Sequence, residues 1–157
     1  MGMDVSGIAP SSEAGEYFRA NCWSWRPIHA LIWIANARHA NTIVSEEAMK
    51  AMHYNDGAGL QDQASCDNLA AALEEILEDP VNSLAPYPDI IYANPREVEA
   101  FFTFPLDKDG SGVDETGRFV SAKEVPVETL RNPYSTHISH VREFISFLRD
   151  SGGFSVW

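Results

Sequence analysis

Three segments of the chain repeat apolar residues every three or four positions, the spacing that places them on one face of a helix. The first predicts a helix from about Arg26 to His39, with Ser24 as its cap. The second, QDQASCDNLAAALEEILEDP, ends at Pro80, and the third, STHISHVREFISFLRDSGG, ends near Gly152. The stretch SEEAMKAMHYN predicts a further, short helix. We therefore expect three main helices.

Other segments have the alternation or the composition of strands. GMDVSGI near the start and GFSVW at the end both alternate, and we expect them to pair and to bring the termini together. VEAFFTFPL and RFVSAKEVPV are two further predicted strands, separated by the glycine-rich segment DKDGSGVDETG. The pattern predicts an α+β fold, with short antiparallel strands around the helices in a single compact domain over residues 1–157.

Composition agrees with one folded core. A chain of 157 residues, 45% of them hydrophobic, is long enough to bury roughly 70% of the surface that it would expose when unfolded. We expect the only two cysteines, Cys22 and Cys66, to be buried thiols in a reducing compartment. No run approaches the roughly 20 apolar residues of a membrane span, and no secretory signal is recognisable. These features predict a cytoplasmic protein that does not bind membranes.

Charge restricts the class of partner. The net charge of −12 argues against direct binding of nucleic acid, because that affinity comes largely from Lys and Arg. No basic residue occurs between Lys50 and Arg96. On the second predicted helix, four carboxylates lie opposite the apolar stripe, and one more lies in the preceding turn: Asp67, Glu74, Glu75, Glu78 and Asp56. We expect them to bind a protein with a basic surface, unless they serve only to keep the chain soluble.

The segment DKDGSG resembles the first half of a calcium loop. Asp107, Asp109 and Ser111 stand at the first three ligand positions of an EF-hand, followed by the glycine of the sharp turn. The twelfth position, which should be Glu, is Arg118, so an EF-hand is excluded. An irregular calcium site completed by Glu115 remains one interpretation. The other is a long hairpin tip, whose glycines adopt positive φ.

A second alternative is an enzyme or a small-ligand binder. Aromatic residues gather around the start of the first predicted helix: Tyr17, Phe18, Trp23, Trp25 and Trp33. They could form a stacking platform, with His53 as a base oriented by Asp56, or they could belong to the core. His29 on that helix fits a core or rim position. The chain contains no GxSxG, GxGxxG or Walker sequence, so no activity follows from a local motif.

The segments MGMDVSG, GEYFRANCWSWRPI, NDGAGL, LAAALEEIL and VREFISFLRDSGGF resemble a group of small phage and bacterial proteins without an assigned activity. Many members of that group carry a CxxC-type knuckle in the middle, where this chain has DKDGSG, so a metal role does not transfer. The resemblance implies a phage accessory protein in the host cytoplasm that acts by binding. An inhibitor of a host defence or nucleic-acid-handling complex would fit that description, with no cofactor required.

Overall fold

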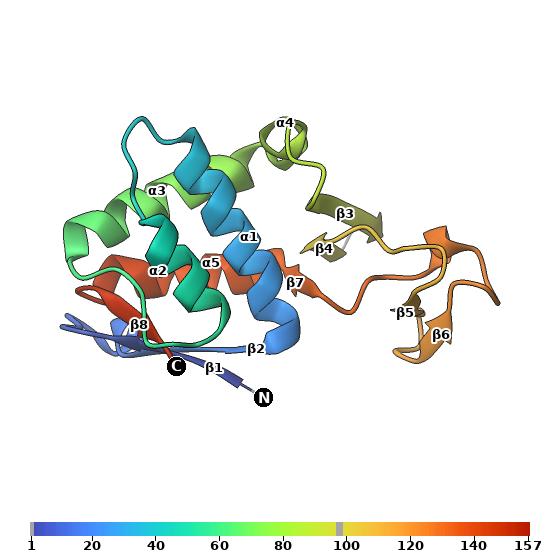
Figure 1. Cartoon of the computed structure of the whole chain (residues 1–157), viewed down its shortest axis with the longest axis horizontal. Helices are drawn as coiled ribbons and strands as arrows, with labels where there is room; N and C mark the ends of the chain where they lie inside the picture. The colour runs from blue at the N-terminus through green and yellow to red at the C-terminus, as the bar shows by residue number, and fades with distance from the viewer. Residues whose placement is uncertain (1, 97–98) are drawn as a thin grey trace.

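The computed structural model describes residues 2–96 and 99–157 of the chain (Figure 1). Its helices are α1 (Cys22–Arg38), α2 (Glu46–His53), α3 (Gln63–Glu78), α4 (Pro80–Leu84) and α5 (Ile138–Asp150). Single 3₁₀ turns are η1 (Glu13–Gly15) and η2 (Val127–Thr129). The strands are β1 (Gly2–Gly7), β2 (Tyr17–Asn21), β3 (Ile91–Arg96), β4 (Glu99–Thr103), β5 (Ser111–Val113), β6 (Phe119–Ser121), β7 (Ser135–His137) and β8 (Phe154–Val156). The predicted α+β class is confirmed.

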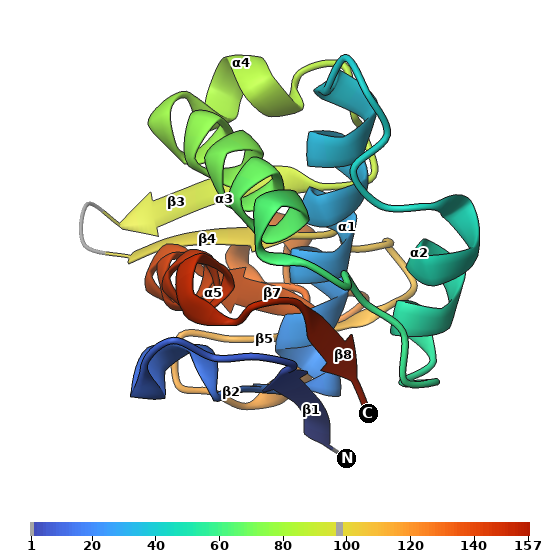
Figure 2. The same cartoon turned by 90° about the vertical axis from the view of Figure 1, so that its left-hand side faces the viewer.

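The two ends of the chain pair in one antiparallel sheet, as predicted. Strand β1 lies at its centre, in the order β2-β1-β8, and Val5 is paired with Phe18 on one side and Val156 on the other (Figure 2). The amide of Trp157 donates to the carbonyl of Asp4 over 2.7 Å, which extends the pairing to the last residue. The sheet thus holds both termini against the helices.

The two predicted strands around the glycine-rich segment form, but they do not pair with each other. Strand β4 pairs with β3 and β7, whereas β6 pairs with β5 in a separate hairpin that lies apart from the helices (Figure 1). The hairpin turns at residues 114–117, beyond the DKDGSG segment. There the Asp114 carboxylate accepts the amides of Thr116 and Arg118, and Gly117 has a φ of 83°.

Helix α1 starts earlier than the sequence pattern suggests, at Cys22 instead of near Arg26. The Asn21 side chain accepts the amide of Ser24 over 2.8 Å, and the Ser24 hydroxyl accepts the amide of Asn21. This reciprocal capping box satisfies two amides at the helix start. Ser24 is therefore inside the helix and is not its cap, and Pro27 lies within the helix.

Within a largely aliphatic core, a cluster of aromatic rings lies between the terminal sheet and the three long helices. Phe144 of α5 is fully buried, and its ring centroid lies 5.1 Å from that of Phe18 and 5.8 Å from that of Trp25. Phe154 of β8 packs on it edge-on from the third side, at 6.0 Å. One side chain thus joins α5 to β2, α1 and β8, and helices α1 and α3 close the core around it.

Helix α3 ends at Glu78 before Pro80, as predicted, and the chain then begins the unpredicted short helix α4. Asp79 links the two, because its side chain accepts the amide of Asn82 while Pro80 occupies the first turn.

Within residues 2–96 and 99–157, no helix combines the length and the apolar run that a membrane span requires.

Candidate functional site

The predicted acidic surface of α3 is partly neutralised by the chain itself. Arg149, in the last turn of α5, places its Nη2 atom 2.9 Å from Oε2 of Glu74 and its Nη1 atom 3.8 Å from Oδ1 of Asp67. Sequence reasoning missed this pair because the partners are 75 residues apart. Exposed ion pairs of this kind contribute only about 0–1 kcal/mol to stability, but they lower the net charge that a partner would meet.

The remaining predicted docking residues do not form one patch. Glu75 and Glu78 are exposed, and no hydrogen bond or ion pair reaches their carboxylates from the described part of the chain. Asp56 is also exposed but lies before the start of α3, and a helix of this length separates its two ends by about 24 Å. The acidic surface therefore consists of Glu75 and Glu78 near the end of α3, with Asp56 elsewhere.

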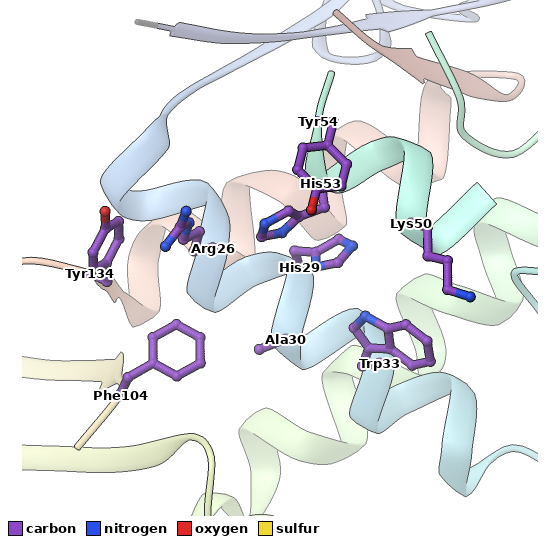
Figure 3. Close-up of a pocket in the computed structure, with 9 residues that line it drawn as sticks. All are labelled: Arg26, His29, Ala30, Trp33, Lys50, His53, Tyr54, Phe104 and Tyr134. Carbon is purple, nitrogen blue, oxygen red and sulfur yellow. The ribbon is translucent and has the colours of Figure 1, made fainter. Parts of the chain in front are cut away.

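A pocket lies between α1 and α2, with a volume of about 520 Å³ (Figure 3). We call it the α1–α2 pocket. Helix α1 contributes a face with spacings of three and four residues: Arg26, His29, Ala30 and Trp33. Lys50, His53 and Tyr54 line it from α2, and Phe104 and Tyr134 from the segments that follow β4 and precede β7. Its volume is within the range of sites for small organic ligands.

Polar side chains of α1 hold α2 in position beside it. Nε2 of His29 lies 2.7 Å from the carbonyl of Met49, and the indole N–H of Trp25 donates to the carbonyl of Met52 over 3.1 Å. The Met52 carbonyl belongs to the last turn of α2, where helix carbonyls lack partners within the helix, and the Met49 carbonyl lies three residues earlier. The intervening loop is held by Asn36, whose side chain bonds the backbone of residues 43 and 44. The wall of the pocket is thus anchored by hydrogen bonds.

The lining is cationic in an otherwise acidic protein. Arg26 lies over the ring of Tyr134, with Cζ 4.5 Å from the ring centroid, and Lys50 lies at the opposite end. Among the residues that the structure describes, no Asp or Glu lines the pocket. Burial lowers the pKa of His29, and burial together with the nearby Arg26 charge lowers the pKa of His53. Both imidazoles are therefore neutral at pH 7, and Arg26 and Lys50 carry the charge.

The aromatic residues singled out in the sequence divide among three environments. Phe18 and Trp25 are in the core, and Tyr17 is exposed and bonds Asp4. Trp23 packs on Tyr134 with ring centroids 4.6 Å apart, and Trp33 alone of the five lines the pocket. The core interpretation is confirmed for Phe18 and Trp25, whereas ligand stacking stays a prediction, which only Trp33 is placed to serve.

The predicted pairing of His53 with Asp56 is not present. His53 lines the pocket and packs against the rings of His29 and Tyr54, at 5.3 and 4.8 Å, whereas Asp56 is not among the lining residues. No described hydrogen bond or ion pair joins His53 to Asp56. His53 therefore lacks the carboxylate that would orient it as a base.

The thiol of Cys66 is buried as expected, which raises its pKa, while Cys22 is only half-buried.

The calcium candidates lie on the β5–β6 hairpin and the loop before it. Asp109 forms a 3.6 Å ion pair with Lys123, and the carbonyl of Asp107 accepts the amide of Gly110 in a turn. Ser111 opens β5, and Glu115 lies in the turn beyond it. Within the described ranges, no three His, Cys, Asp or Glu side chains converge as metal ligands would. The structure adds no support for the calcium interpretation.

Comparison of the chain with protein-family models, curated proteins and solved structures gave no match. The site is therefore interpreted from its own chemistry. The α1–α2 pocket brings together four separate parts of the chain, and the sequence pattern pointed to His29, Trp33 and His53 but missed Arg26, Lys50, Phe104 and Tyr134. One wall of the pocket could be predicted from the sequence, because the spacing of Arg26, Ala30 and Trp33 places them on one face of α1.

Proposed function

We propose that the protein binds a small organic molecule in the α1–α2 pocket. One observation carries the proposal, namely that a solvent-open pocket of ligand size is lined by aromatic rings and nitrogen donors and has a wall anchored by hydrogen bonds. Trp33 is 41% exposed and Tyr54 67% exposed, and large rings left open to solvent beside a cavity are typical of ligand sites. The lining supplies stacking surfaces and donors, so binding is the activity proposed.

The proposal is tested with N-phenyl-1-naphthylamine, an uncharged aromatic probe whose fluorescence rises in apolar surroundings. Ala30 is half-buried and lines the pocket, so Ala30→Phe should fill the volume and abolish the fluorescence increase. Ala71→Phe, on the exposed side of α3, is the matched control and should leave binding unchanged. Absence of binding to the unmodified protein, or equal binding by both variants, would contradict the proposal.

A second candidate function is docking of a basic protein partner on the surface around Glu75 and Glu78. It is favoured by their exposure, by the absence of a described ion pair at either, and by the lack of any basic residue between Lys50 and Arg96. In the setting that the resemblance implies, the partner would be a host defence or nucleic-acid-handling complex.

This second candidate is tested by affinity capture from host lysate at low and high salt. The double reversal Glu75→Lys/Glu78→Lys should release a captured protein that high salt also releases. The reversal Glu13→Lys/Glu16→Lys on the other side of the fold is the control, because both residues are exposed. A partner retained equally by both variants would mean that the surface around Glu75 and Glu78 does not bind it.

A further inference from the structure

The α1–α2 pocket differs from the rest of the protein in the sign of its charge. The chain as a whole carries −12, whereas the lining carries Arg26 and Lys50 and, among described residues, no carboxylate. We infer that the natural occupant is a planar aromatic molecule that bears an anionic group, which Arg26 binds. The inference rests on the proposed function of the pocket and specifies the class of its ligand.

The guanidinium of Arg26 is oriented but not neutralised. Its Cζ lies over the face of the Tyr134 ring, 4.5 Å from the ring centroid, which is a cation–π contact. In the described part of the chain, no hydrogen bond or ion pair to a carboxylate occupies its N–H groups. The planar fork of N–H groups of an arginine can bind a carboxylate or phosphate through two parallel hydrogen bonds.

Two other arginines of this protein bind acceptors within the chain. Arg149 binds Glu74 and Asp67, and Arg131 donates to the Ser135 hydroxyl over 2.6 Å. Arg26 has an aromatic ring as its described partner and faces a cavity instead of an acceptor. An anion from solution would supply that acceptor.

Lys50 adds a second positive charge at the opposite end of the pocket (Figure 3). Its ammonium lies 2.6 Å from Glu46 one turn earlier on α2, and both side chains are largely exposed. Such an exposed pair stabilises the protein little, so Lys50 can turn toward a ligand. A cationic ligand would be repelled by the unpaired guanidinium at the Arg26 end of the pocket, which disfavours that class.

The aromatic part of the ligand follows from the surfaces between the two charges. Ala30, whose side chain is small, lies between Phe104 and Trp33 in the pocket (Figure 3). Rings on either side of a small residue leave room for a flat group that packs against them. The neutral imidazoles of His29 and His53 complete this part without adding charge.

The test compares two probes that differ in one charged group. 8-Anilino-1-naphthalenesulfonate is an aromatic anion, and N-phenyl-1-naphthylamine is its uncharged counterpart without the sulfonate. Arg26→Gln should weaken binding of the anion about tenfold, the effect of losing one charge-assisted hydrogen bond, and leave the neutral probe unchanged. Arg38→Gln, an exposed arginine at the end of α1, is the control and should change neither. Arg26→Lys, which keeps the charge but loses the planar fork, should give an intermediate loss.

The outcomes separate this inference from the proposed function. If Ala30→Phe abolishes binding of both probes but Arg26→Gln and Arg26→Lys bind both like the unmodified protein, the pocket binds ligands and the anionic class is wrong. If neither probe binds the unmodified protein, both the function and the ligand class fail. Far-UV circular dichroism of each variant shows whether a loss of binding comes from unfolding.

Competition identifies the anionic group. Adenosine 5′-monophosphate and indole-3-acetate each combine a planar ring with an anion, phosphate in one and carboxylate in the other. Displacement of the sulfonate probe by either supports the inference, and the stronger competitor indicates which group Arg26 prefers. Adenosine without phosphate should compete less well than its monophosphate. Failure of both anions to displace the probe would count against the inference.

Discussion

Substituting Gly59 by Ala should destabilise the protein although its backbone conformation permits Ala. Residues 58–60 run beside β8, where the amide of Phe154 donates to the carbonyl of Leu60 over 2.7 Å and that of Val156 to Ala58 over 2.9 Å. The φ of Gly59 is not in the left-handed region. However, a methyl group added there would overlap the carbonyl oxygen of Phe154, a backbone atom that no side-chain rotation can move.

The loss in the free energy of unfolding can be estimated from the contacts of β8 that the new methyl group would break. Loss of the two hydrogen bonds to β8 costs about 1–3 kcal/mol in total, at the usual net value of each. Displacement of β8 also loosens Phe154, which is fully buried against Phe144. The lower entropy of the unfolded Ala chain offsets about 0.4–1 kcal/mol. We therefore expect Gly59→Ala to lower the free energy of unfolding by about 1–3 kcal/mol, a large fraction of the 5–15 kcal/mol of an ordinary domain.

The assay is urea unfolding followed by far-UV circular dichroism, in which a loss of stability lowers the midpoint at constant slope. The matched control is Gly117→Ala. Gly117 has a φ of 83° but would bring the new methyl group within 4 Å of no atom, so only the backbone strain of about 1–2 kcal/mol opposes the substitution. If Gly59→Ala destabilises the protein no more than Gly117→Ala, the steric explanation for Gly59 is wrong.

Three further predictions concern the core, the pH dependence of stability and calcium. Phe144→Ala should lower the free energy of unfolding by about 3–5 kcal/mol in the same assay, because the ring is fully buried among other rings. Folding lowers the pKa of His29, so the unfolded chain binds more protons, and the melting temperature should fall as the pH drops below about 6.5. His29→Gln should reduce that dependence without abolishing it, since the pKa of His53 is lowered too. Melting curves in calcium and in EDTA should coincide, because Asp109 pairs with Lys123; a shift in calcium would restore the calcium interpretation.

The helices and the terminal strands could be predicted because each is set by local sequence. The apolar stripes that define α1, α3 and α5 repeat within a few residues of one another, and the alternation of β1 and β8 is equally local. The start of α1 was misplaced although its signal was also local. Asn21 and Ser24 have the spacing of a capping box. Because Ser is itself a preferred N-cap residue, the pattern favours Ser24 as the cap instead of Asn21.

The candidate site could be predicted only in part, because its chemistry depends on residues far apart in the chain. His29, Trp33 and His53 were noted from their residue types. The contact between Arg26 and Tyr134 and the ion pair between Arg149 and Glu74 both join distant segments. Counting the carboxylates along α3 therefore overestimated the negative charge of its surface, because Arg149 pairs with two of them. The net charge of the chain likewise gave no indication that Arg26 and Lys50 line one pocket.

Both ends of the chain and the segment 57–60 meet at one place in the fold. β1 and β2 pair there, the segment 57–60 lies against β8, and the positive φ angles of Gly152 and Gly153 turn the chain from α5 into β8. Methyl groups at Gly59 and Gly152 would overlap backbone atoms of neighbouring segments, so these glycines are required by close packing. They hold the scaffold and take no part in the pocket.

Scaffold and pocket are therefore separate in this sequence. Trp33, Lys50, Phe104 and Tyr134 of the pocket all lie outside the segments that join the termini. Trp33 and Lys50 are exposed, and exposed side chains change stability little, so substituting them should leave the fold intact. The glycines thus set how the termini are joined, and the proposed ligand class is inferred from the charges and rings of the pocket itself.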